Sequence, residues 1–274
     1  EDRKFESFKE FTLWILIPLG VELLLILNGS ASTALVLGGL AFLLLIIGGI
    51  KTGHLVKTVG IASGIIALVI MLHFAFGLFP RIATMVSRVK NFTVEKSLDH
   101  TLTPQEKQRE LDKTFQADMA KIAIASANVI GKGPGKSTQR YVLPHPYSDF
   151  IYSIIVEEWG LVGGTVILML YLWFLYRCIA IARGCLKMFS AITVIGLGLL
   201  IVSQAMLHIL VNVSILPVTG HTLPLISLGG TSLIIMSSAF GIILAVSRSV
   251  ENSKCKVPAE SEIQENQTEE NIEL

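Results

Sequence analysis

Long apolar runs alternate with shorter polar segments along most of the chain. Six runs come close to the roughly 17–25 residues that a helix needs to cross a bilayer. They are Phe11–Leu27, Thr33–Ile50, Thr58–Phe79, Ile151–Tyr176, Phe189–Leu216 and Thr222–Val246. The first contains Pro18, and the last is interrupted by Pro224 and by two adjacent glycines. The pattern predicts an all-α, polytopic membrane helix bundle.

The polar segments divide the chain into four parts. Residues 1–79 and residues 151–248 each hold three of the predicted membrane helices. Between them, residues 80–150 form a polar loop that is too long for a simple connection, so we expect it to carry function. Residues 249–274 are rich in Glu, Gln and Asn and lack apolar periodicity. We expect them to form a disordered cytoplasmic tail.

The basic residues predict how the helices are oriented. Lys and Arg occur in segments 1–10, 51–57, 177–187 and 248–256, whereas the alternate turns 28–32 and 213–221 contain none. Short cytoplasmic loops retain Lys and Arg. We therefore expect both ends of the chain to be cytoplasmic and loop 80–150 to be extracytoplasmic.

Composition narrows the class of protein. Of the 274 residues, 52% are hydrophobic and only 16% are charged, whereas about a quarter are charged in soluble domains. The net charge is +1 and there is no basic stripe, so we expect no nucleic-acid partner. Cys178, Cys185 and Cys255 have no metal-ligand spacing, which argues against a zinc site. Because the chain begins with Glu1, we expect it to be part of a longer protein.

Loop 80–150 contains two helix signals. Residues 103–106 form a capping box with Pro104 in the first helical position, which predicts a helix start. Apolar residues at helical spacing predict a helix over Phe115–Ile130, and Gly131 is suited to end it. No strand precedes the glycines that follow, which excludes a dinucleotide-binding fold.

Three basic residues follow this helix. Lys132, Lys136 and Arg140 lie in or beside a glycine-rich turn. Two interpretations have equal weight: a site for a lipid-linked phosphate, and an ordinary solvated loop.

The junction between this loop and the fourth apolar run contains three carboxylates. Ser148 or Asp149 can cap the helix that begins at Ile151, and its dipole favours an ionised acid there. Capping and a functional role have equal weight for Asp149. Glu157 and Glu158 lie deeper in the run, where a carboxylate is costly unless it faces a cation or a polar cavity. At least one of them should point into the protein.

Small residues and one histidine mark the interior of the predicted bundle. The pairs Gly60 with Gly64 and Gly160 with Gly164 fit the spacing that lets helices approach closely. His208 lies within an apolar run, and we interpret it as a hydrogen-bonded interior group and not as a ligand.

Two long motifs carry a resemblance to a known family. The first runs from Gly131 to Gly163; it includes GKGPGKSTQR at 131–140, Asp149 before Phe150, and EEWG at 157–160. The second runs from Asn212 to Ser232 and includes LPVTGHTLPLISLGGTS at 216–232. Together they resemble the signature of the FtsW/RodA/SpoVE (SEDS) family. The resemblance extends to about Ser249 and implies that the six helices are the last six of ten.

The resemblance implies a peptidoglycan glycosyltransferase that polymerises lipid II, an undecaprenyl-diphosphate-linked disaccharide peptide. The reaction takes place on the outer face of the bacterial inner membrane, during cell division and cell-wall synthesis. Asp149 matches the family's essential loop aspartate and would act as general base towards the acceptor hydroxyl. The implied partners are membrane lipid, a class B penicillin-binding transpeptidase and other divisome proteins.

The leaving diphosphate needs countercharge and no proton. Arg81, Lys136 or Arg140 would supply that charge, together with a divalent cation such as Mg or Mn if one binds. We identify no metal-ligand set. The other residues that we expect to contact substrate are Ser137, Gln139, Glu157, Thr219 and Ser227.

Departures from the family pattern leave the acceptor contacts open. His145 stands where the family usually has Glu, and Lys136 stands where it usually has Asn. The segments 133–135 and 223–227 favour the division branch, which includes FtsW, over the elongation branch.

Two other functions remain as alternatives. A lipid II flippase would use Glu157 and Glu158 in a polar path, and broken helices suit transporters. A non-catalytic divisome scaffold that recruits a transpeptidase would not need Asp149. The position of Asp149 at the membrane interface favours the enzyme.

Overall fold

A computed structural model describes residues 8–76, 115–116, 118–143, 146–216 and 220–272 of the chain. Every regular element in these ranges is a helix, which confirms the all-α fold class. The elements are α1 (Phe8–Phe11), the π-helical turn η1 (Thr12–Leu16), α2 (Ile17–Gly29), α3 (Ala31–Ile47), α4 (Thr52–Phe76), the 3-10 turn η2 (Gln139–Tyr141), α7 (Ile151–Arg183), α8 (Met188–Asn212) and α9 (Gly230–Ile272).

Each of the six predicted membrane runs contains a helix, but the fifth helix ends at Asn212 and the sixth begins at Gly230 and not at Thr222. Four stretches are long and apolar enough to cross a membrane: Phe8–Gly29, Ile151–Arg183, Met188–Asn212 and Gly230–Asn252. The apolar helix α3 has 17 residues, close to the lower limit for a span. The third run continues beyond α4, and its end lies outside the described residues. The chain is a multi-pass membrane protein.

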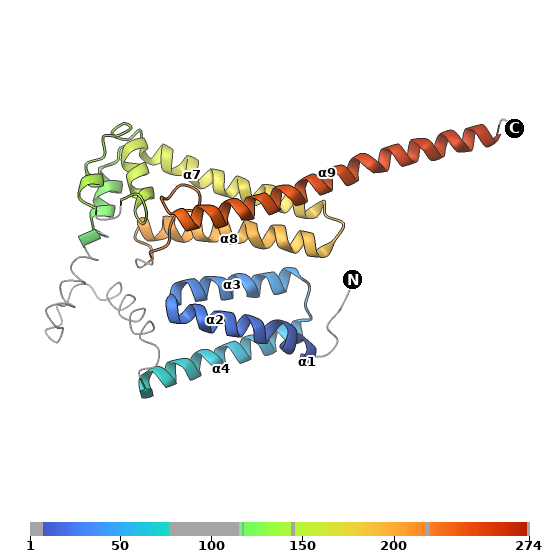
Figure 1. Cartoon of the computed structure of the whole chain (residues 1–274). Helices are drawn as coiled ribbons and strands as arrows, with labels where there is room; N and C mark the ends of the chain where they lie inside the picture. The colour runs from blue at the N-terminus through green and yellow to red at the C-terminus, as the bar shows by residue number, and fades with distance from the viewer. Residues whose placement is uncertain (1–7, 77–114, 117, 144–145, 217–219, 273–274) are drawn as a thin grey trace.

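The helices form two groups that meet at α3 and α8. Figure 1 shows α2, α3 and α4 on one side and α7, α8 and α9 on the other. Helix α8 packs against α7, α9 and α3, and so lies at the centre of the molecule. A buried apolar cluster including Tyr171, Val194 and Ile243 joins α7, α8 and α9. At Gly198, an added Cβ would lie 2.9 Å from the Cys178 side chain, so only glycine allows this approach of α8 to α7.

The connections lie at two opposite ends of the bundle. The start of α1 and the far end of α9 lie at one end, and the loop after 115 lies at the other (Figure 1). The segment between α8 and α9 lies beside this loop, because the two share hydrogen bonds. This alternation is the one expected from the basic residues. Which end faces the cytoplasm stays a prediction.

Helix α9 continues beyond residue 249. It ends at Ile272 and extends beyond the other helices in Figure 1. Glu, Gln, Lys and Ala are good helix formers and occur in this segment, which also contains Pro258. The disorder and the cytoplasmic location expected of residues 249–274 stay predictions.

The helix expected over Phe115–Ile130 is confirmed in a shorter form. The described residues 115–116 and 118–126 are helical, so the helix ends before Ile130, and Ala120 and Ala123 within it are buried. Ala120 packs with Leu143 and Phe150, which ties this helix to the start of α7. The capping box at 103–106 lies outside the described residues.

Helix α7 is broken at Gly160, where the sequence predicted close helix packing. The backbone there has φ 72° and ψ −172°, which a residue with a side chain rarely adopts. The break turns the first part of α7 back on the second, so that a Cβ at Gly164 would lie 2.9 Å from the Tyr152 hydroxyl. At Gly60 and Gly64, by contrast, no described atom lies within 4 Å of an added Cβ, so the close packing expected for that pair is not seen in the described structure.

Candidate functional site

The glycine-rich loop docks onto the break in α7. The amide of Lys132 donates to the carbonyl of Glu157 (3.0 Å), and the amide of Gly133 donates to the carbonyl of Glu158 (2.9 Å). Both carbonyls would otherwise lose their helical partners at the break. A Cβ on Gly131 would lie 2.4 Å from the Glu158 carbonyl oxygen, so the contact requires glycine. The glycines of the first motif thus join the loop to the helix.

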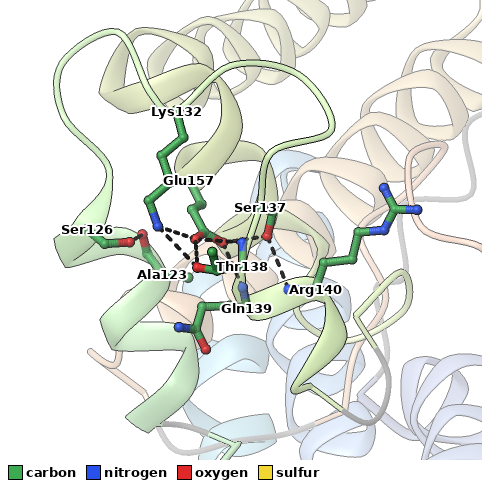
Figure 2. A network of polar contacts seen from close by, with 8 residues as sticks. All are labelled: Ala123, Ser126, Lys132, Ser137, Thr138, Gln139, Arg140 and Glu157. Carbon is green, nitrogen blue, oxygen red and sulfur yellow. Dashed lines mark hydrogen bonds and ion pairs between the residues drawn. The ribbon is translucent and has the colours of Figure 1, made fainter.

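The carboxylate of Glu157 holds the loop in place through hydrogen bonds. It is 0% exposed and accepts five hydrogen bonds, as Figure 2 shows. The donors are the ammonium of Lys132, the hydroxyls of Ser137 and Thr138, and the backbone amides of Thr138 and Gln139. Lys132 also forms an ion pair with it. A buried charge is tolerable when it is paired and fully bonded in this way.

This network changes the interpretation of several predicted residues. Glu157 points inward, as expected for one of the two glutamates, but its bonds leave it no evident contact with substrate. Ser137 is 2% exposed and is occupied by Glu157, and Gln139 meets the same carboxylate through its backbone. Lys132 forms an ion pair with Glu157, so its charge is not available to a ligand as those of Lys136 and Arg140 are.

Arg140 and Lys136 keep their charges available. The Arg140 guanidinium points away from Glu157 in Figure 2 and lies over the rings of Tyr141 (5.7 Å) and Tyr147 (5.4 Å). Lys136 is exposed. Neither forms an ion pair with any carboxylate in the described ranges. Of the three predicted loop cations, these two remain suited to an anion.

Asp149 does not cap α7, contrary to one of the two interpretations. The N-cap residue is Phe150, and no side chain there bonds the first turn. The Asp149 carboxylate instead accepts a hydrogen bond from the Ser148 hydroxyl (2.8 Å), and the residue is half-buried. It has no ion-pair partner among the described residues. An aspartate that neither caps the helix nor forms an ion pair can act on a ligand.

The backbone around Asp149 is held by the second motif. Three consecutive carbonyls, those of residues 147, 148 and 149, each accept a hydrogen bond from it. The donors are the amide of Leu228 (3.0 Å), the hydroxyl of Ser227 (2.8 Å) and the side-chain amide of Asn212 (3.2 Å), in that order. The two motifs, far apart in sequence, therefore form one site.

Asn212, which the sequence analysis named only as the first residue of the second motif, belongs to the candidate site. It is 0% exposed; its amide oxygen accepts from the backbone (3.3 Å) and the hydroxyl (2.7 Å) of Ser153, and its nitrogen also donates to the His208 carbonyl (2.9 Å). The available signal was a polar residue at the end of an apolar helix. Ser227, expected to bind substrate, is 6% exposed and holds the Ser148 carbonyl.

Two imidazoles complete the surroundings of Asp149. His208 is 1% exposed, and its Nδ1 lies 2.7 Å from the carbonyl oxygen of His221, which confirms the expected hydrogen-bonded interior group. Burial lowers the pKa of His221, and the negative charge of Asp149 opposes this effect. Gly220, at φ +70°, brings the loop so close that an added Cβ would lie 4.0 Å from Asp149 Oδ2.

Two residues of the predicted site, Arg81 and Thr219, lie outside the described residues, as does His145. Within the described ranges, no three His, Cys, Asp or Glu side chains are grouped as a metal would require.

Comparison with known proteins agrees with the two motifs. Residues 1–252 match the family model described as the cell cycle protein family FtsW/RodA/SpoVE. The chain is 40% identical over 139 residues to stage V sporulation protein E of Bacillus subtilis, covering 50% of this chain and 38% of that protein. It is 39% identical over 148 residues to a probable peptidoglycan glycosyltransferase FtsW of Thioalkalivibrio sulfidiphilus, covering 52% and 37% of the two chains.

A solved structure also resembles the fold. It belongs to work on structural coordination of polymerization and crosslinking by a peptidoglycan synthase complex. The match has a TM-score of 0.59 and 25% identity, and covers 91% of this chain and 65% of that one. The match to the two curated relatives above covers well under half of their length. It belongs to the FtsW/RodA/SpoVE family.

Proposed function

We propose that this chain carries the active site of a peptidoglycan glycosyltransferase that polymerises lipid II, with Asp149 as general base. The observation that carries the proposal is the state of Asp149. Its backbone is fixed by three successive carbonyl contacts, while its carboxylate has no cation partner in the described ranges. A base needs this combination of fixed position and available lone pairs.

The reaction can be written with the groups at hand. The acceptor sugar's hydroxyl oxygen attacks the donor's anomeric carbon, and its proton passes to the Asp149 carboxylate. The bond from that carbon to the diphosphate breaks, and the diphosphate leaves with the electron pair. The side chains of Arg140 and Lys136 are cations without an ion-pair partner among the described residues. They would stabilise the negative charge of the leaving diphosphate. The names of the relatives support the same activity.

The proposal includes the setting of the reaction. The protein would lie in the bacterial inner membrane, with the Asp149 end extracytoplasmic and both ends of this chain cytoplasmic. Its partners would be a class B penicillin-binding transpeptidase and other divisome proteins. The likeness to a chain of a peptidoglycan synthase complex supports a synthase partner.

The flippase alternative loses part of its support. It relied on Glu157 as a group lining a polar path, and this carboxylate is occupied by five hydrogen bonds and an ion pair. The break in α7 is likewise filled by the backbone of loop 131–133. Both features are explained by loop docking.

The test is lipid II polymerisation by the protein expressed from its complete gene, purified with its transpeptidase partner. We expect wild-type protein to form glycan chains and Asp149→Asn to lose about 10²–10⁴-fold in rate. The thermal unfolding midpoint should stay unchanged, because the contacts that hold residue 149 are made by its backbone. Near-normal chain formation by Asp149→Asn would reject Asp149 as the base, whereas absence of chain formation by the wild type would leave the scaffold or flippase functions.

A further inference from the structure

Two buried imidazole nitrogens near Asp149 have no hydrogen-bond partner in the described part of the chain. They are Nε2 of His208 and Nε2 of His221. Buried polar atoms are nearly always bonded, because an unpaired one loses the hydrogen bonds that it would make with water. His208 is linked to Asp149 through Asn212, and His221 follows Gly220, which lies close to the Asp149 carboxylate.

The hydrogen bond of His208 determines the state of its free nitrogen. Its Nδ1 lies 2.7 Å from the backbone carbonyl of His221. A carbonyl oxygen only accepts, so Nδ1 carries the hydrogen. In the neutral ring, Nε2 is then a bare acceptor on the other side of the imidazole.

Three contacts bring the two rings to Asp149. The Asn212 side-chain nitrogen donates to the carbonyls of both Asp149 (3.2 Å) and His208 (2.9 Å). The Asp149 carboxylate also lies beside Gly220, the residue before His221.

We infer that His208 and His221 form, with Asp149, a binding site for the hydroxyl groups of a sugar. The inference rests on the proposed function and names the acceptor side of that same site. A hydroxyl has one hydrogen, and Asp149 takes that of the reacting group. The imidazole nitrogens then receive neighbouring hydroxyls of the same sugar, which orients the ring for attack.

The charges at the site favour a neutral ligand. An anion would be repelled by Asp149, which has no ion-pair partner among the described residues. A hydroxyl both donates and accepts, so it suits the acceptor nitrogen of His208 and either tautomer of His221. The diphosphate is accounted for separately, at Arg140 and Lys136.

Two substitutions of His208 separate binding from folding. His208→Asn keeps a side-chain N–H that can reach the His221 carbonyl but removes the group at Nε2. His208→Gln places an amide at the Nε2 position. The matched control is His54→Asn, because His54 also has a buried ring nitrogen without a partner but lies in α4, stacked on Phe11.

The probe is lipid II, tested with the protein expressed from its complete gene. Binding gives Kd, polymerisation gives KM and kcat, and thermal unfolding reports folding. We expect His208→Asn to raise Kd and KM about 3–10-fold, the loss of one hydrogen bond, with the unfolding midpoint unchanged. His208→Gln should recover most of this loss, and His54→Asn should match wild type.

Each other outcome is decisive. Unchanged Kd and KM in His208→Asn, with an active wild type, would overturn the sugar site alone. A lowered unfolding midpoint without recovery by Gln would assign His208 a structural role and also overturn it. Lipid II binding that depends on His208 but yields no polymer would support the site and reject the proposed glycosyltransferase. Absence of lipid II binding by wild type would reject both.

Discussion

Asp149 lies just before α7 and Glu157 lies in its first part, yet the surroundings of the two carboxylates are opposite. Glu157 is fully buried, and its oxygens accept five hydrogen bonds and an ion pair from Lys132. Asp149 is half-buried, and its carboxylate accepts one hydrogen bond, from the adjacent Ser148. At Glu157 the side chain is held, whereas at Asp149 the backbone is held.

This difference separates a structural carboxylate from a reactive one. A fully bonded carboxylate has no lone pair left for a ligand, and its charge is already balanced. A carboxylate fixed through its own peptide group keeps both oxygens for chemistry. The three bonds to carbonyls 147–149 thus give Asp149 a defined position without neutralising it.

The largest stability effect should come from Glu157→Gln. The variant leaves the Lys132 ammonium without its partner and replaces an acceptor oxygen by a donor. Removing one member of a buried pair costs about 3–5 kcal/mol, and we expect the lower end because Lys132 is 29% exposed at its side chain. The measurement is the free energy of unfolding in detergent.

The control for Glu157→Gln is Glu158→Gln, since no side-chain bond of Glu158 occurs among the described contacts. Equal stability of the two variants would contradict the structural role of Glu157. If Glu157→Gln instead kept wild-type stability and lost polymerisation, Glu157 would belong with Asp149 as a group that acts on substrate.

Gly160→Ala should destabilise the loop docking that supplies Lys132 to Glu157. A Cβ there would lie 2.2 Å from the Val129 carbonyl oxygen, at a φ of +72°. Strain of this kind costs about 1–3 kcal/mol. Gly64→Ala is the matched control, because an added Cβ there meets no described atom within 4 Å. Proteolysis of loop 131–140 measures the docking, and equal cleavage of both variants would contradict it.

Asn212→Ala should impair Asp149 without touching its carboxylate. The variant removes the donor to the Asp149 carbonyl. It also removes the acceptor of the Ser153 hydroxyl. We expect about 1–3 kcal/mol lower stability and a reduced kcat with KM little changed. Polymerisation kinetics and thermal unfolding test this together. A full kcat would mean that the carbonyl contacts of Tyr147 and Ser148 are sufficient.

The sequence predicted most of the fold and part of the site. Apolar length alone located the helices, because spanning a bilayer requires a long run of apolar residues. It could not locate the break at Gly160, which depends on a loop docking at that residue. The continuation of helix α9 beyond residue 249 was not predicted, because the prediction weighed hydrophobicity and not helix propensity.

At the site, the motifs predicted which residues belong to it but not which hydrogen bonds those residues form. The motifs identified Asp149, Ser137 and Ser227, but only the structure shows that the two serines bond Glu157 and the Ser148 carbonyl. Of the two interpretations of this segment, capping of α7 by Ser148 or Asp149 is wrong, because Phe150 occupies the N-cap position. Such outcomes depend on distances between segments that are remote in sequence.

The smallest expected effect is a pH dependence of stability at His221. Burial lowers the pKa of this imidazole, with Asp149 opposing the shift. In the unfolded chain the pKa is about 6.5, so below that pH the unfolded state binds a proton that the folded state binds only at lower pH. Stability should therefore fall as pH falls from about 6.5 through the lowered folded-state pKa, and then level off.

The variant His221→Asn removes this titration and should show a shallower loss of stability between about pH 7.5 and pH 5.5. Thermal unfolding of the substrate-free protein across this range is the measurement. Asp149→Asn is the informative second variant: removing the opposing charge lowers the His221 pKa further, so the decline should steepen. A decline of the same slope in all three proteins would show that Asp149 and His221 do not interact. The placement of His221 in the surroundings of Asp149 would then be wrong.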